Sequence, residues 1–230
     1  MRVLGLVPAR YGSKGVERKN IKLLGGKPLL EYTAEAALAA RTLTRIVLST
    51  DATEIADVGQ RCGLEVPFLR PPELARDETP MLPVVQHAVN WLSGQGETFD
   101  AVCLLQPTNP FRRPEDIDGC VDLLAGSDAD SVVSIRQVPD EYNPYWVYLV
   151  GDDRSLKLFS GASEPFSRRQ VLPSAYYRDG SVYVTRTHVL IRGNSLYGDR
   201  VLGYSMVGDH AVNIDNVEDW KEAEKLVLAR

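Results

Sequence analysis

The amino-acid sequence predicts an α/β fold built on a doubly wound, mostly parallel sheet. Short apolar runs alternate with helical stretches over most of the chain, and this alternation is typical of βαβ units. The first run, Val3-Leu4-Gly5-Leu6-Val7, is apolar throughout, as expected of a parallel strand with both faces covered. With 230 residues and 44% hydrophobic content, the chain is long enough to bury one substantial core.

The expected strands and helices alternate in order along the chain. We expect strands, each an apolar or alternating run, at residues 3–7, 45–50, 66–69, 100–107, 131–135 and 180–184. We expect helices, each rich in helix-forming residues or amphipathic, at residues 29–40, 53–62, 81–92, 114–124 and 217–229. Pro114 stands at a helix start, where proline is favoured, and Asp51 is placed to cap the helix at 53–62.

The alternation of strands and helices breaks between residues 137 and 177. Four prolines and the apolar run 145–150 lie in this stretch, which contains no clear amphipathic helix. Because a loop of this length without structure is uncommon in a compact domain, we expect the run to form a strand that packs on another surface. The sequence therefore predicts one domain, residues 1–230, that carries residues 137–177 as an inserted extension.

Composition excludes several classes of protein. The formal net charge of −5 argues against general binding to nucleic acid. No apolar run approaches the roughly 20 residues of a membrane span, and no signal peptide fits the N-terminus. Cys62, Cys103 and Cys120 form no C-x-x-C pair and indicate free thiols in a reducing compartment. We therefore expect a cytoplasmic protein without a membrane or nucleic-acid partner.

A basic, glycine-containing loop follows the first strand. It holds Gly12 and Gly15 with four cationic side chains, and such a loop can wrap a polyphosphate. The spacing matches neither G-x-x-x-x-G-K-[ST] nor G-x-G-x-x-G, so neither a Walker loop nor a dinucleotide fingerprint is present. A solvated basic loop is the alternative, and the position directly after a buried strand favours a nucleotide site.

Polar side chains follow several of the expected strands at their carboxyl ends. Arg10 follows the first strand, Arg70 the strand at 66–69 and Gln106 the strand at 100–107, while Asp215 precedes the last helix. Ligands of doubly wound sheets bind at this edge of the sheet. We therefore expect these four side chains to converge on one ligand.

Several segments resemble the signature of the CMP-sugar synthetases, which are the acylneuraminate cytidylyltransferases and their relatives for other nonulosonic acids and Kdo. Residues 7–20 stand where that family has its triphosphate loop, and residues 68–75 resemble its F-x-R-P-x-x-L-A segment. Residues 104–112 match its L-L-Q-P-T-S-P-L-R motif closely. The resemblance covers most of the chain and implies a Rossmann-like nucleotidyltransferase fold that binds CTP. It implies a nucleotide site formed by Ala9, Arg10, Ser13, Lys14, Lys19, Asn20, Arg70, Thr79 and Gln106.

The resemblance also implies a Mg²⁺ site before the last helix. The family has an I-D-I-D-type segment there, and this chain has Val212-Asn213-Ile214-Asp215. Asp215 matches the second aspartate and Asn213 replaces the first, so Asn213 would offer only a neutral carbonyl oxygen. The alternative role for Asp215 is a helix N-cap. The histidines, His87, His188 and His210, are too scattered for a zinc cluster.

The resemblance implies an acidic sugar as the second substrate and a homodimer formed through the extension. Sugar contacts are implied at Gln106, Arg169, Tyr183, Leu196 and Tyr197. The chain departs from the family pattern at Asp179, where the family has asparagine, and at Trp146, where some sialic-acid enzymes have lysine. These departures concern the identity of the nonulosonic acid and leave the reaction class unchanged.

The reaction expected from the loop and the resemblance is attack of the sugar hydroxyl on the α-phosphorus of CTP, with pyrophosphate leaving. Arg10, Lys19 and Asp215 are the expected catalytic residues, because this chemistry depends on positioning and charge stabilisation. The alternatives are a CMP-Kdo-type synthetase, a silent homologue and a nucleotide-sugar glycosyltransferase. Asp128-Ala129-Asp130 has the D-x-D form of the last class, but it precedes a strand and is better interpreted as a polar turn.

Overall fold

The computed structural model describes residues 1–206, 208 and 212–229. It divides into two compact units, which are described in turn. The first unit comprises Met1–Ser134 with Gly180–Arg230, and the second comprises Ile135–Asp179. His210 lies outside the described residues.

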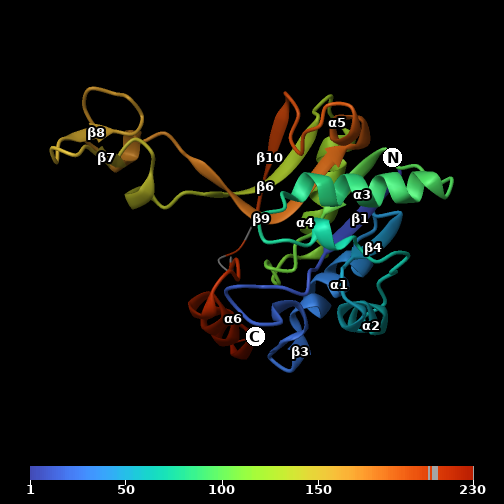
Figure 1. Ribbon diagram of the computed structural model, residues 1–230. Helices are drawn as coiled ribbons and strands as arrows, with labels where there is room; N and C mark the ends of the chain where they lie inside the picture. Colours follow the sequence, from blue (N-terminus) through green and yellow to red (C-terminus); the bar gives the residue numbers. More distant parts are fainter. Residues whose placement is uncertain (207, 209–211, 230) are drawn as a thin grey trace. The chain divides into compact units, whose positions relative to one another are not determined.

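A six-stranded sheet forms the centre of the first unit (Figure 1). Its order is β10-β6-β9-β5-β1-β4, and β1 pairs in parallel with both β4 and β5, while β5 pairs antiparallel with β9. The expected α/β fold with a mostly parallel sheet is confirmed. The strands are β1 (Val3–Pro8), β4 (Arg45–Ser49), β5 (Ala101–Leu104), β6 (Ser131–Gln137), β9 (Tyr176–Arg186) and β10 (Val201–Ser205), of which β6 and β9 continue into the second unit.

Helices cover both faces of this sheet, so the sheet is doubly wound (Figure 1). Alternate side chains of β1 face opposite layers: Val3 and Val7 pack with one group of helices, and Leu4 and Leu6 pack with the other. Helices α1 (Leu29–Ala39), α2 (Thr53–Arg61) and α4 (Pro114–Ala125) form the first layer, and α3 (Met81–Gly94) and α5 (Thr187–Ile191) form the second. β1 is therefore buried on both sides, as its continuous apolar run predicts.

The last helix, α6 (Val217–Leu228), packs beside the small hairpin β2 (Leu23–Leu24) and β3 (Lys27–Pro28) through Trp220 and Ala223. Asn216 caps α6, because its side chain accepts a hydrogen bond from the Asp219 N–H at 2.9 Å. The alternative role of Asp215 as the N-cap is therefore wrong.

Two sequence-based expectations for the first unit need correction. No strand spans residues 66–69; two isolated parallel bridges, Val47 with Glu65 and Thr50 with Leu69, stand there. Pro67 lies between them and has no N–H to donate, which explains the broken ladder. Asp51 does not cap α2, because the N-cap of that helix is Ala52. The Asp51 carboxylate instead accepts a hydrogen bond from the Tyr11 N–H at 2.9 Å.

The second unit is built around a two-stranded hairpin of β7 (Tyr148–Val150) and β8 (Leu156–Leu158). Its apolar side chains are largely exposed, with Leu149 at 54%, Val150 at 70% and Leu156 at 63%. The Asp179 carboxylate is buried and pairs with Nε of Arg136 at 3.2 Å, so its charge is neutralised within the unit. Among the residues that the structure describes, no helix is long and apolar enough to cross a membrane.

Candidate active site

A pocket of about 270 Å³ lies in the first unit, where the strands β1 and β5 end. The four side chains expected to converge, Arg10, Arg70, Gln106 and Asp215, all line it. The complete lining is Pro8, Arg10, Ser13, Lys14, Gly15, Lys19, Asn20, Arg70, Met81, Gln106, Pro107, Thr108 and Asp215. Four of these side chains are cationic and one is acidic, so the pocket suits a polyanion.

Parallel pairing places the contributing segments at the same edge. The N–H of Leu105 donates to the carbonyl of Leu6 at 2.9 Å, which sets the segment after β5 beside the segment after β1. The N–H of Arg70 donates to the carbonyl of Thr50 at 2.7 Å, which adds the segment after β4. The strand-end rule for doubly wound sheets therefore accounts for the position of the pocket.

Residues 9–20, named here the basic loop, are held in shape by their own polar side chains. The Ser13 hydroxyl donates to the carbonyl of Val16 at 2.7 Å and accepts the Lys19 N–H at 3.2 Å. The Asn20 amide donates to the carbonyl of Arg10 at 2.9 Å. Gly15 is required by packing, because a Cβ there would lie 1.7 Å from the carbonyl oxygen of Asp215. The loop and the segment before α6 are therefore in close contact.

Arg70 brings a buried positive charge to the pocket. Its side chain donates to Ser49, with Nε 3.1 Å from the hydroxyl and Nη2 2.5 Å from the carbonyl oxygen. Burial lowers the pKa of the guanidinium to about 10, so it stays charged at neutral pH. It forms no ion pair with any residue that the structure describes. A buried cation without a carboxylate partner favours an anionic ligand.

Lys19 and Asp215 meet at the other side of the pocket. The Lys19 ammonium donates to the carbonyl of Ile214 at 2.6 Å and lies 3.7 Å from Oδ1 of Asp215. Burial lowers the pKa of Lys19 below its ordinary value of 10.5, and Asp215 offsets part of that shift. The Asn213 amide nitrogen donates to Oδ2 of Asp215 at 2.5 Å, and its oxygen accepts from Asn109 at 3.2 Å.

Asp77 pairs with two cations of the basic loop. One of its oxygens contacts Nη1 of Arg10, and the other lies 2.8 Å from the Lys14 ammonium. These two contacts hold the pKa of Asp77 below its usual range. Asp77 does not line the pocket, although both of its partners do.

Residues 105–113, named here the β5 turn, are fixed by Arg112. This guanidinium is buried and donates to the carbonyl of Ser181 at 2.9 Å, to the hydroxyl of Thr33 at 2.7 Å and to the carbonyl of Gln106. It therefore ties the turn to β9 and to α1. The sequence motif 104–112 contains Arg112, but two of its partners, Thr33 and Ser181, lie too far away in sequence to be predicted.

Some expected site residues lie elsewhere. Ala9 is buried, and its N–H bonds to the carbonyl of Ser49. Thr79 donates to the carbonyl of Glu73 at 3.1 Å and does not line the pocket. Tyr183 and Leu196 pack against the second core layer. The ring centroids of Tyr183 and Tyr197 lie 6.4 Å apart. Arg169 belongs to the second unit, where it pairs with Asp140.

The pocket also includes side chains that the sequence analysis did not select, namely Met81, Pro107 and Thr108. Met81 begins α3, and its apolar side chain gave no functional signal. Thr108 stands inside the L-L-Q-P-T motif, so the motif could have pointed to it. Its carbonyl oxygen accepts the Ile214 N–H at 2.8 Å and joins the β5 turn to the Asp215 segment.

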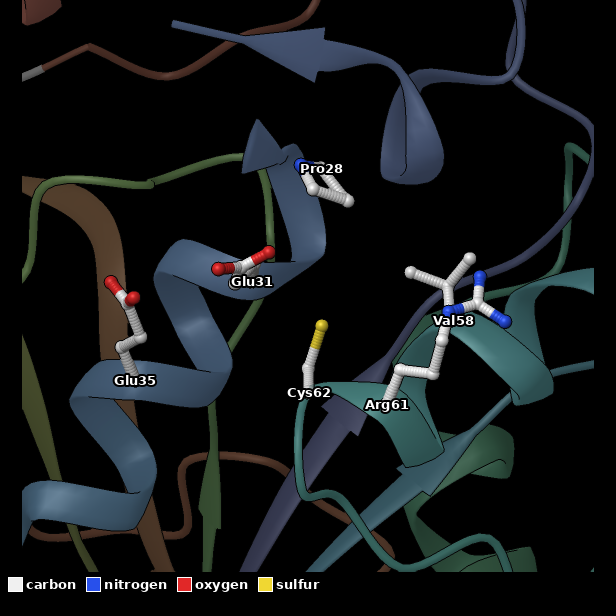
Figure 2. A pocket seen from close by; sticks show the side chains of 6 residues that line it. All are labelled: Pro28, Glu31, Glu35, Val58, Arg61 and Cys62. Carbon is white, nitrogen blue, oxygen red and sulfur yellow. The ribbon is translucent and has the colours of Figure 1, made fainter. Parts of the chain in front are cut away.

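Another hollow of about 310 Å³ lies between α1 and α2 (Figure 2). Glu31 and Glu35 of α1 face Arg61 and Cys62 across it. Burial raises the pKa of the Cys62 thiol, so it is not an activated nucleophile. Glu35 already pairs with Lys27 at 2.5 Å. This mixed charge does not suit a polyphosphate.

The family of the chain follows from its similarity to known proteins. A model of the cytidylyltransferase family matches residues 4–204. The chain belongs to this family and is a CTP-dependent nucleotidyltransferase. It is 34% identical to the CMP-N,N'-diacetyllegionaminic acid synthase of Legionella pneumophila, over 99% of this chain and 97% of that protein. It is 28% identical to an N-acylneuraminate cytidylyltransferase of Streptococcus agalactiae, over 96% of this chain but about half (52%) of that protein.

The fold agrees with this membership. A solved CMP:2-keto-3-deoxy-manno-octonic acid synthetase, in complex with CTP, superposes with a TM-score of 0.73 over 100% of this chain and 99% of that chain. The two sequences are only 17% identical, so this likeness concerns the fold. The resemblance inferred from residues 7–20, 68–75 and 104–112 is thereby confirmed at the level of the family.

Proposed function

We propose that this cytidylyltransferase activates an acidic 2-keto sugar of the nonulosonic acid class with CTP, giving a CMP-sugar and pyrophosphate. The observation that carries the proposal is the pocket itself, in which Arg10, Lys14 and Lys19 of the basic loop and Arg70 of a second segment gather beside one carboxylate, Asp215. The named relatives act on legionaminic and neuraminic acid derivatives, which supports this sugar class. The free cysteines favour a cytoplasmic location.

The residues of the pocket divide the work of the reaction. The cations of the basic loop neutralise the phosphates and the charge that develops on the leaving pyrophosphate. Arg70 and Gln106 complete the nucleotide side, and the β5 turn supplies its shape. The anomeric hydroxyl attacks the α-phosphorus in line, and Asp215 is the candidate acceptor of its proton. The proposed contacts of the sugar remain Gln106, Tyr183, Leu196 and Tyr197 in the first unit and Arg169 in the second.

Mg²⁺ fits the donor set of the pocket as an ion held chiefly by the triphosphate. Mg²⁺ in nucleotide sites commonly takes one or two carboxylates and keeps several waters, and Asp215, whose side chain is 64% exposed, is such a carboxylate. Asn213 would add its oxygen only after its amide turned over, because its nitrogen now faces Asp215. When bound, the ion would neutralise phosphate charge and favour departure of pyrophosphate.

The second unit is the proposed dimerisation surface. Its hairpin exposes Tyr148, Leu149, Val150 and Leu156, and exposed apolar patches of this kind usually mark an interface. We expect light scattering at micromolar concentration to show a homodimer and Leu149→Asp to shift it toward monomer. A wild-type monomer under these conditions would contradict the assignment.

The decisive experiment measures pyrophosphate release with CTP, UTP and ATP, each against N-acetylneuraminic acid, diacetyllegionaminic acid and Kdo. We expect release with CTP and a nonulosonic acid, and little with UTP or ATP. Preference for Kdo would favour the CMP-Kdo-type alternative, and equal turnover of all nucleotides would contradict CTP selectivity. Absence of release with every pair would favour a silent homologue.

The glycosyltransferase alternative has no structural support at Asp128-Ala129-Asp130. Asp128 pairs with Arg200, and Oδ2 of Asp130 accepts the N–H groups of Asp199 and Arg200 at 2.8 and 3.0 Å. These contacts support the interpretation of this segment as polar structure before β6 rather than as a metal-binding pair.

A further inference from the structure

The carboxylate of Asp77 holds two cations of the basic loop from outside the pocket. One oxygen pairs with Arg10, the other lies 2.8 Å from the Lys14 ammonium, and Nη1 of Arg10 also lies 3.5 Å from the carbonyl oxygen of Ala75. Arg10 and Lys14 line the pocket, whereas Ala75 and Asp77 do not. Asp77 therefore does not occupy the place of a ligand.

We propose that Asp77 is a positioning residue for the nucleotide, which holds Arg10 and Lys14 side by side for the phosphates of CTP. The choice of CTP rests on the proposed function, while the argument applies to any polyphosphate. Two cations on one loop repel each other, and each long side chain loses rotamer freedom when a ligand fixes it. A carboxylate between them offsets the repulsion and orders both side chains before the ligand arrives.

The pairing of Asp77 with Arg10 and Lys14 leaves hydrogen-bond donors of both cations available to a ligand. Among the contacts of the described residues, the Arg10 guanidinium uses only Nη1, so Nε and Nη2 remain for phosphate. The Lys14 ammonium has three hydrogens and one carboxylate partner. The Lys14 side chain is 80% exposed, and ion pairs in water contribute little to folding stability. The pairing therefore matters for binding rather than for the fold.

The test compares Asp77→Asn with Glu78→Gln. Glu78 is the next residue, carries the same charge and forms no ion pair among the residues that the structure describes, so it controls for loss of a negative charge alone. Calorimetry measures the Kd for inorganic tripolyphosphate and for CTP. We expect Asp77→Asn to weaken both roughly tenfold, as expected when two side chains must be ordered by the ligand.

Steady-state kinetics separates positioning from chemistry. We expect Asp77→Asn to raise KM for CTP by a similar factor, with kcat at saturating CTP and the urea midpoint little changed. Asp77→Glu keeps the carboxylate and should recover most of the affinity. Unchanged or tighter binding in Asp77→Asn, or an equal change in Glu78→Gln, would overturn the proposal.

The tripolyphosphate arm keeps this inference separate from the proposed function. Tripolyphosphate carries neither base nor sugar, so its binding reports only on the cations. If the wild-type protein turned over no nucleotide, the proposed function would fail while the effect of Asp77→Asn on tripolyphosphate would still decide the role of Asp77.

Discussion

The basic loop and the β5 turn form two walls of one pocket, and they are held in different ways. The basic loop presents charge, and its Arg10 and Lys14 pair with an exposed carboxylate, Asp77. The β5 turn presents neutral groups to the pocket. It is fixed by the buried guanidinium of Arg112, which donates hydrogen bonds to neutral oxygens of three residues. The cations of the basic loop are therefore held by exposed ion pairs, which contribute little to folding stability. The shape of the β5 turn is held by buried hydrogen bonds, whose loss costs stability.

The first prediction concerns the β5 turn, where the largest effect is expected. Arg112→Met should lower the free energy of unfolding by about 3 kcal/mol or more, because three acceptors at this buried site lose their donor. Urea denaturation measures this, with the exposed Arg61→Met as the control. A variant as stable as wild type would show that Arg112 does not fix the turn.

The second prediction applies the same test to the basic loop. Arg10→Ala and Lys19→Ala should each lower kcat/KM by about 10- to 150-fold, since a charge-assisted hydrogen bond to phosphate contributes about 1.5–3 kcal/mol. Their free energy of unfolding should change by no more than about 1 kcal/mol, because Arg10 is partly exposed and loss of Lys19 also relieves its desolvation. Lys221→Ala, on the exposed surface of α6, is the matched control. Full activity in either variant would contradict the triphosphate site.

The third prediction concerns Asp215, which the basic loop contacts at Gly15 and Lys19. If Asp215 holds Mg²⁺, Asp215→Asn should raise the half-saturating Mg²⁺ for pyrophosphate release roughly tenfold. Since Asn216 caps α6, lost helix capping does not explain such a change. Asn213→Asp restores a second carboxylate and should leave the rate within about threefold while tightening Mg²⁺. A normal Mg²⁺ dependence in Asp215→Asn would remove the metal role.

Much of the fold was predictable because its signals are local. The apolar run 3–7 predicted β1, and the helical stretches predicted α1 to α4 and α6 within a few residues of their bounds. The prediction of a strand at 66–69 was wrong, because Pro67 has no N–H and interrupts the hydrogen-bond ladder with the neighbouring strand. Helix α5, of five residues, and β10, an edge strand containing Gly203, are too short and too weakly patterned to be seen.

A site residue was predictable where its position at the end of a strand brings it to the pocket. It was not predictable where its role depends on a partner that is far away in sequence. Arg10, Arg70 and Gln106 follow strands, so a rule about sheets brings them together. Asp77 lies 67 residues from Arg10, and Arg112 lies 79 residues from Thr33. Only the three-dimensional arrangement reveals that one carboxylate orders two cations and that one buried arginine fixes a turn.

The last prediction concerns pH and has the smallest expected effect, because the Asp77 ion pairs are exposed. Arg10 and Lys14 lower the folded-state pKa of Asp77 from its ordinary value of 3.8. A carboxyl whose folded pKa is depressed contributes stability above its unfolded pKa, and that stability is lost as pH falls through the folded value. The difference in unfolding free energy between wild type and Asp77→Asn should therefore be constant from pH 7 to about 5 and shrink below 3.8. Urea titrations of wild type and Asp77→Asn at pH 7, 5 and 3.5 measure this difference. A difference of the same size at pH 3.5 as at pH 7 would mean that Arg10 and Lys14 do not lower the pKa of Asp77.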